Sequence, residues 1–176
     1  MKKILILLLL VAPMSLLAQQ KFGYVNSEEI VQVMPEYAKA QKEIQDLEKM
    51  YTEEFNSMRT ELEKKGTEFE KMQQDSVPEN ILKRRYEELM QLQQRLQEYG
   101  QEIQQNLQKA EMEKMTEINK KLQDALATVG KEGSYVCIFD AAGSIPFINT
   151  NICEDVTAKV KSKLGIAANA VPAVAK

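Results

Sequence analysis

Apolar residues recur at intervals of three and four over most of this chain, from residue 36 to residue 129. After residue 78, one apolar side chain returns every seventh residue, at Leu82, Leu89, Leu96, Ile103 and Ala110. Such a repeat is typical of helices that wrap around another helix. The pattern therefore predicts two long helices, over residues 36–74 and 78–128.

The break between these helices falls at Asp75-Ser76-Val77-Pro78. Proline is tolerated in the first turn of a helix but not in its interior, so Pro78 marks a new start. The two helices are thus expected to fold back on each other as an antiparallel hairpin. Gly66 and Gly100 interrupt the apolar seam, and each costs roughly 1 kcal/mol relative to alanine in a helix interior.

The segments on either side of the hairpin have strand character. Residues 21–25, 135–139 and 145–148 are rich in aromatic and β-branched side chains, which favours three short strands. Pro146 lacks an N–H donor, which indicates an edge position for the third strand. Ser27 is expected to cap a short helix that Pro35 ends, Gly130 and Gly133 to stop the second long helix, and a last helix to run to about Leu164.

The predicted fold class is mainly α, with a long antiparallel helical hairpin on a small β base. Residues 36–129 form the hairpin, residues 19–35 and 130–166 form the base, and residues 167–176 form a disordered tail. Because so small a core and an unpaired hairpin stripe leave apolar surface exposed, we expect several bases to associate. The strand residues expected in that contact are Phe22, Tyr24, Tyr135, Ile138 and Phe139.

The first 18 residues resemble a secretory signal peptide. Lys2 and Lys3 precede a short apolar run, and Ala18 is the expected cleavage position. The alternative is an uncleaved N-terminal anchor, which the shortness of the run disfavours. An exported protein without stable membrane insertion is expected.

Charge and composition argue against several classes of function. Removing Lys2 and Lys3 from the 23 basic residues leaves 21 against 26 acidic ones, a net charge of −5, which argues against nucleic acid as a partner. The chain has no histidine, so Ser-His and Cys-His pairs are excluded and the commonest zinc ligand is missing. No catalytic, cofactor or metal site is expected, and the protein is not expected to be an enzyme.

The two cysteines, Cys137 and Cys153, fall in one small subdomain of an exported protein. They can form a disulfide, or they can remain two buried free thiols. The sequence leaves both alternatives open.

The two ends of the mature chain resemble the Skp, or OmpH-like, family of periplasmic chaperones. The similarity lies in Lys21-Phe22-Gly23-Tyr24-Val25-Asn26-Ser27, in Pro35-Glu36-Tyr37, in Phe139-Asp140 and in Asp155-Val156-Thr157. The resemblance implies a periplasmic homotrimer whose helical arms enclose unfolded outer-membrane barrel proteins without using ATP. Well-known members are strongly basic whereas this chain is acidic, so electrostatic attraction to acidic clients or lipopolysaccharide is not carried over.

Methionine and aromatic residues on the arms are the candidates for client contact, because methionine adapts to many surfaces. They are Phe55, Met58, Phe69, Met72, Tyr86, Met90, Tyr99 and Met112. The alternative is that most of them pack one arm on the other, but Met90 and Met112 lie beside the seam and are expected to be exposed. The competing function is a structural coiled-coil protein of the envelope without client binding.

Overall fold

The computed structural model describes residues 20–171, which form two compact units. The hairpin unit comprises residues 35–118, and the base unit comprises residues 20–34 and 119–171. The proposed signal peptide lies outside the described residues. The predicted fold class, long helices with a small β base, is confirmed.

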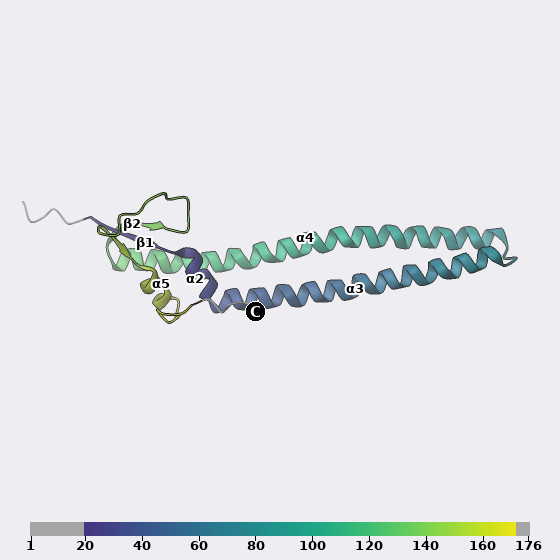
Figure 1. Ribbon diagram of the computed structural model, residues 1–176, viewed down its shortest axis with the longest axis horizontal. Helices are drawn as coiled ribbons and strands as arrows, with labels where there is room; N and C mark the ends of the chain where they lie inside the picture. Colours follow the sequence, from purple (N-terminus) through teal and green to yellow (C-terminus); the bar gives the residue numbers. More distant parts are fainter. Residues whose placement is uncertain (1–19, 172–176) are drawn as a thin grey trace, which may run out of the picture. The chain divides into compact units, whose positions relative to one another are not determined.

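Two helices make up the hairpin unit, α3 (Pro35–Gln74) and most of α4 (Glu79–Glu132) (Figure 1). Their 40 and 54 residues correspond to roughly 60 and 80 Å of helix. Asp75 and Ser76 form the turn between them, and the carbonyl of Pro78 accepts from the N–H groups of Ile81 and Leu82. The predicted turn is therefore confirmed.

Helix α4 continues further than the glycines suggested. Gly130 lies inside the helix, and the Gly133 N–H still donates to the carbonyl of Val129 at 2.9 Å. The helix persists because Val129 and Ala125 are buried in the base unit, and this burial outweighs the low helix propensity of one glycine. The expectation that Gly130 stops the helix was wrong.

The base unit holds a parallel three-stranded sheet in the order β2-β1-β3. Its strands are β1 (Lys21–Val25), β2 (Tyr135–Asp140) and β3 (Cys153–Asp155). A parallel pair needs a long crossover connection, and the chain from α2 to α4 supplies it between β1 and β2.

The third strand is not the one that the sequence suggested. Residues 145–148 are irregular, and β3 forms at Cys153–Asp155 instead. A strand reached from β2 by the short predicted turn would pair antiparallel, whereas β3 lies parallel on the far side of β1 and needs the longer connection.

Two short helices, α2 (Ser27–Val33) and α5 (Thr157–Lys163), complete the base unit. The core between the sheet and these helices holds some of the most deeply buried side chains of the described chain: Val25, Ile30, Met34, Val156 and Val160. The N-cap of α2 is Asn26 rather than the expected Ser27. Its side-chain oxygen accepts from the Glu29 N–H at 3.0 Å, while Ser27 Oγ donates to Asp140.

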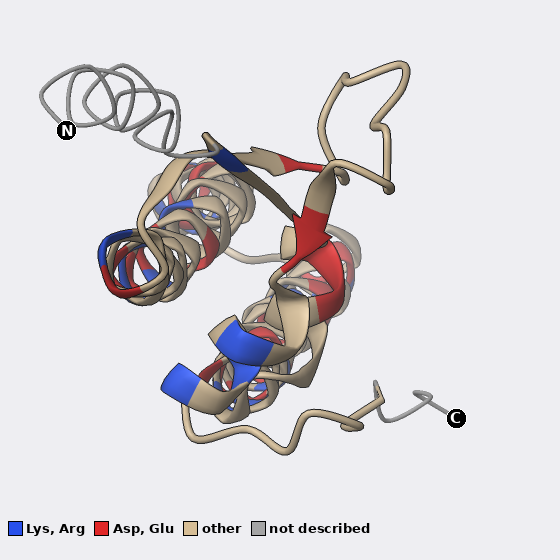
Figure 2. Ribbon diagram, turned by 90° about the vertical axis from the view of Figure 1, so that its left-hand side faces the viewer, with Lys and Arg blue, Asp and Glu red and all other residues tan. Residues whose placement is uncertain are grey.

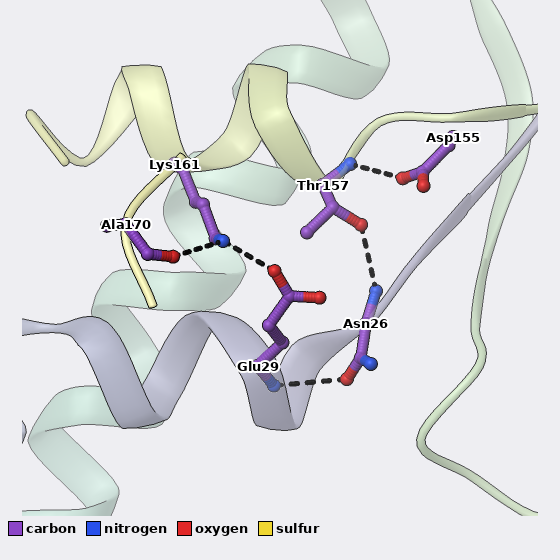
Figure 3. Close-up of polar contacts among 6 residues, drawn as sticks. All are labelled: Asn26, Glu29, Asp155, Thr157, Lys161 and Ala170. Carbon is purple, nitrogen blue, oxygen red and sulfur yellow. Dashed lines mark hydrogen bonds and ion pairs between the residues drawn. The ribbon is translucent and has the colours of Figure 1, made fainter. Parts of the chain in front are cut away.

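Polar contacts join α5 to α2 and to the chain that follows α5 (Figure 3). Lys161, only 2% exposed, donates from Nζ to Glu29 Oε1 at 2.5 Å and to the carbonyl oxygen of Ala170 at 3.0 Å. The Asn26 N–H donates to Thr157 Oγ1 at 3.1 Å, and the Thr157 N–H donates to Asp155 Oδ1 at 2.9 Å. Residue 170, in the segment predicted to be disordered, therefore has a defined contact.

Candidate functional site

Three pairs of side chains fix how α3 and α4 face each other in the hairpin unit. Lys114 Nζ lies 2.6 Å from Glu43 Oε2, and Tyr99 OH donates to Glu54 Oε2 at 2.6 Å. Nearer the turn, the rings of Phe69 and Tyr86 lie 6.1 Å apart. From one pair to the next, the residue number rises on α3 and falls on α4, so both partners lie nearer the turn. This is the register of an antiparallel hairpin.

Five of the eight candidate client-binding residues are half-buried: Phe55, Met58, Phe69, Met72 and Tyr99. Gly100 makes room for one of them, because a Cβ there would lie 3.5 Å from Phe55 Cε2. The Tyr51 and Tyr99 rings meet edge-on at 6.3 Å. These positions therefore serve mainly to join the arms, as the alternative interpretation held.

The other three candidates project from the hairpin. Tyr86 is 52% exposed, Met90 is 42% exposed and Met112 is 61% exposed. The expectation that Met90 and Met112 are exposed is confirmed. Met50, at 52% exposed, joins them and was missed by the sequence analysis, because it precedes the seam residue Tyr51 and no periodic signal distinguishes it.

The ribbons of the long helices carry both acidic and basic residues (Figure 2), and most charged side chains of the hairpin unit are exposed. Several form pairs four residues apart, such as Lys39 with Glu43 at 3.7 Å and Lys49 with Glu53 at 3.9 Å. Exposed pairs of this kind contribute only about 0.3–0.5 kcal/mol each. The arms therefore offer isolated apolar side chains on a surface of mixed charge.

The hydrogen bonds between α3 and α4 shift the pKa values of the side chains that form them. The hydrogen bond to Glu54 raises the pKa of Tyr99 to about 12, because the phenol proton is held by a carboxylate. The Lys114 ammonium lowers the pKa of Glu43 by hydrogen bonding, and the Glu43 carboxylate raises the pKa of Lys114 in turn. Both links are therefore intact near neutral pH.

An apolar hollow of about 340 Å³ opens between α3 and α4 beside the Lys114–Glu43 pair. Its walls include Tyr37, Ala40 and Ile44 from α3 and Met115 from α4. This volume is at the lower end of the range for ligand-sized pockets. Among the described residues, no group of three or more cysteines, aspartates or glutamates is placed to hold a metal ion.

The five predicted contact residues of the base divide between the two faces of the sheet. Phe22 and Tyr24 pair in register with Cys137 and Phe139, so these side chains share one face, and the Phe22 and Phe139 rings stack at 6.3 Å. Ile138 lies on the opposite face, where a Cβ on Gly130 would be 3.7 Å from it.

Tyr135 also packs within its own chain. Lys21 Nζ lies 4.4 Å from the centre of its ring, and Lys159 Nζ donates to its hydroxyl at 3.0 Å. Glu154 accepts hydrogen bonds from Lys159 and lies 2.9 Å from Lys21, and these partners lower its pKa to about 2. Tyr135 and Ile138 are thus half-buried by contacts within the base unit.

The two cysteines are free, which decides between the two alternatives that the sequence left open. Both pair in register with Phe22, Cys137 from β2 and Cys153 from β3, on opposite sides of β1. Two strand spacings separate their Cα atoms by roughly 9.6 Å, beyond the limit of about 7 Å for a disulfide. Cys153 is buried, whereas Cys137 is exposed.

Large apolar side chains are strongly exposed around β2 and the loop that follows it. Phe147 is 77% exposed, and Val136, Ile145 and Ile152 are also exposed. β2 and β3 are both edge strands of the sheet. Open edges beside an apolar loop are typical of a surface that another protein chain covers.

Comparison with known proteins bears on this architecture. The model of a family described as outer membrane protein (OmpH-like) matches residues 21–164, which is most of the chain. The chain belongs to the OmpH-like family. The resemblance found in the sequence is therefore confirmed, and its end motifs fall inside the matched span.

A crystal structure from Caulobacter crescentus CB15, assigned as a candidate outer membrane chaperone (OmpH-like), has the same fold. The two align with a TM-score of 0.70 over 84% of this chain and 85% of that chain, at 15% identity. No curated protein sequence matches this OmpH-like chain. Within residues 20–171, none of its helices is both long enough and apolar enough to cross a membrane.

Proposed function

We propose that this protein is a periplasmic, ATP-independent holdase that binds unfolded outer-membrane β-barrel proteins and keeps them from aggregating before membrane insertion. Membership of the OmpH-like family and the fold shared with the Caulobacter protein support a chaperone function in general. The client class and the periplasmic location are the finer parts of the proposal, and both come from the family resemblance.

The observation that carries client binding is the set of apolar side chains that the arms present to solvent: Met50, Tyr86, Met90 and Met112. A holdase needs many weak contacts with an unfolded chain and little affinity for the native one. Isolated methionines suit this task, because the unbranched thioether fits many partner shapes. The charges between them keep the free arms from associating with each other.

The hollow between α3 and α4 offers a deeper contact of the same kind. Ile44 and Met115 line it, and both are half-buried. A single aromatic or aliphatic side chain of an unfolded client fits this volume. Binding there would add to contacts made at the exposed methionines rather than replace them.

The base unit supports assembly into a homotrimer as part of the same proposal. Phe22 and Phe139 on one sheet face and Phe147 in the loop give an apolar surface that associating copies of the chain would cover. Burial of such side chains contributes about 1.5–3 kcal/mol each. Three hairpins attached to one assembled base would present their exposed methionines to a single client.

The second candidate function is a structural coiled-coil protein of the envelope without client binding. The half-buried residues between the arms suit this function as well. It does not explain why methionines occupy solvent-facing positions on helices that are otherwise charged. A spacer would have no use for adaptable apolar groups at those positions.

Suppression of aggregation separates the two functions. An unfolded outer-membrane barrel protein is diluted from urea into buffer with an equimolar amount of assembled protein, and turbidity is recorded. The test variant carries glutamine at Met50, Tyr86, Met90 and Met112, and its matched control carries leucine at the three methionines. We expect wild type and the leucine variant to prevent turbidity and the glutamine variant to prevent much less. Turbidity unchanged by wild-type protein would refute the holdase.

A further inference from the structure

The kinds of apolar side chain exposed in the two units differ. In residues 35–118, all of which are described, the large apolar side chains exposed to solvent are Tyr86 and three methionines. Every leucine, isoleucine, valine and phenylalanine of that span is buried or half-buried. In the base unit, the exposed apolar residues are instead phenylalanine, isoleucine and valine.

The remaining described methionines are protected to different degrees. Met34 is 1% exposed in the core of the base unit. The other three, Met58, Met72 and Met115, are half-buried between α3 and α4. The described methionines therefore fall into two groups: three exposed on the arms, and four buried or half-buried.

We propose that Met50, Met90 and Met112 are modification sites at which peroxide-class oxidants convert the client-binding surface from apolar to polar. This inference rests on the proposed holdase function. Each thioether sulfur takes one oxygen atom from hydrogen peroxide, the O–O bond breaks, and water leaves. The sulfur is oxidised by two electrons to a sulfoxide, and the peroxide is reduced.

The structure shows why this change affects binding rather than folding. At Met112 the neighbours are polar: Lys109, Glu113, Thr116 and Glu117 line a shallow hollow beside it. The Thr116 hydroxyl already donates to the carbonyl of Met112, but the Lys109 ammonium carries donors that a sulfoxide oxygen can accept from, so the oxidised side chain is accommodated on the surface. The helix backbone is unaffected, because none of its hydrogen bonds uses the sulfur.

The effect on a client follows from the small number of such groups. A sulfoxide is polar and chiral, and it no longer makes the adaptable apolar contact of a thioether. Because three of the four exposed apolar groups on the arms are methionines, one oxidant removes most of that surface at once. Methionine sulfoxide can be reduced back, so the change is reversible.

The test uses the full mature protein and dilute hydrogen peroxide. Peptide mass spectrometry over time should show oxidation at Met50, Met90 and Met112 well before Met34. Far-ultraviolet circular dichroism should remain unchanged, while the dissociation constant for an unfolded barrel protein rises severalfold. The matched control replaces the three exposed methionines by leucine, which retains the apolar contact and cannot form a sulfoxide. Its client affinity should not respond to the same treatment.

Two results would overturn the inference: Met34 oxidised as fast as Met112, or client binding unchanged although all three sites are oxidised. A leucine variant that loses binding as fully as wild type would also overturn it, since the loss would then arise elsewhere. Failure of the untreated protein to bind a client is a different result, and it would refute the holdase proposal itself.

Discussion

Replacing Gly66 by alanine should stabilise the hairpin. Gly66 lies inside α3, and no atom outside its own helix turn lies within 4 Å of where its Cβ would be. Alanine in a helix interior is more favourable than glycine by about 0.8–1.0 kcal/mol, because glycine loses more backbone entropy on folding. With no contact to disturb, the whole of this difference should appear as a higher free energy of unfolding.

Alanine at Gly100 should also raise the free energy of unfolding, whereas alanine at Gly133 should lower it. A Cβ on Gly100 meets Phe55 at 3.5 Å, an ordinary van der Waals contact, so this substitution should also stabilise by about 1 kcal/mol. The two sites are far enough apart that their effects should add. At Gly133 a Cβ would clash with the Tyr135 ring, so alanine there must displace a ring that Lys21 and Lys159 contact.

Urea unfolding followed by far-ultraviolet circular dichroism measures all three variants, at one fixed protein concentration because assembly shifts apparent stability. We expect a higher midpoint for Gly66→Ala at an unchanged slope, a still higher one for the double variant, and a lower one for Gly133→Ala. If Gly66→Ala left the midpoint unchanged, the interpretation of residue 66 as an unstrained helix interior would be refuted.

Three further predictions concern thiols and titration. One thiol, Cys137, should react with a thiol reagent in the native protein and Cys153 only after unfolding, and any intrachain disulfide found by mass spectrometry would contradict the sheet register. The pKa of Tyr99 is raised from 10.0 to about 12 in the folded protein. The hydrogen bond from Tyr99 to Glu54 should therefore stabilise the fold below pH 10 and lose that effect as the pH rises toward 12. In an ultraviolet titration, the late ionisation of this phenol should disappear in Glu54→Gln. The pKa of Glu154 is lowered from 4.5 to about 2, so its contribution to the stability of the fold should be present above pH 4.5 and lost as the pH falls toward 2. The acid unfolding curves of wild type and Glu154→Gln should therefore converge over that range.

The hairpin could be predicted because its information is local. The seven-residue repeat beginning at Leu82 and the proline at position 78 specify two helices and the turn between them. The antiparallel arms also return the chain to its starting level and so bring β1 beside β2, but the register of these two strands is a finding of the structure. The third strand could not be predicted, because the apolar run at 145–148 has a strand character that the sheet does not use, whereas the acidic segment at 153–155 becomes a strand through its pairing with β1.

Helical periodicity, which is also local information, predicted part of the apolar surface that the arms expose. The positions of Met90 and Met112 relative to the seam indicated exposure, and both are exposed. Periodicity could not distinguish Met50 from the seam residue beside it, nor show that Tyr86 leans outward while its ring stays near Phe69. The state of the two cysteines could not be decided from the sequence, because proximity in sequence does not reveal that β1 lies between the two strands.

The central claim is that the assembled protein holds an unfolded barrel protein, and the mass of the complex in solution tests it most directly. The mature protein is measured by light scattering after size-exclusion chromatography, alone and after a urea-unfolded outer-membrane barrel protein is diluted into it. The account predicts a mass of three chains alone and of three chains plus one client in the mixture, with the client in solution. A monomer or dimer whose mass is unchanged while the client precipitates would contradict it.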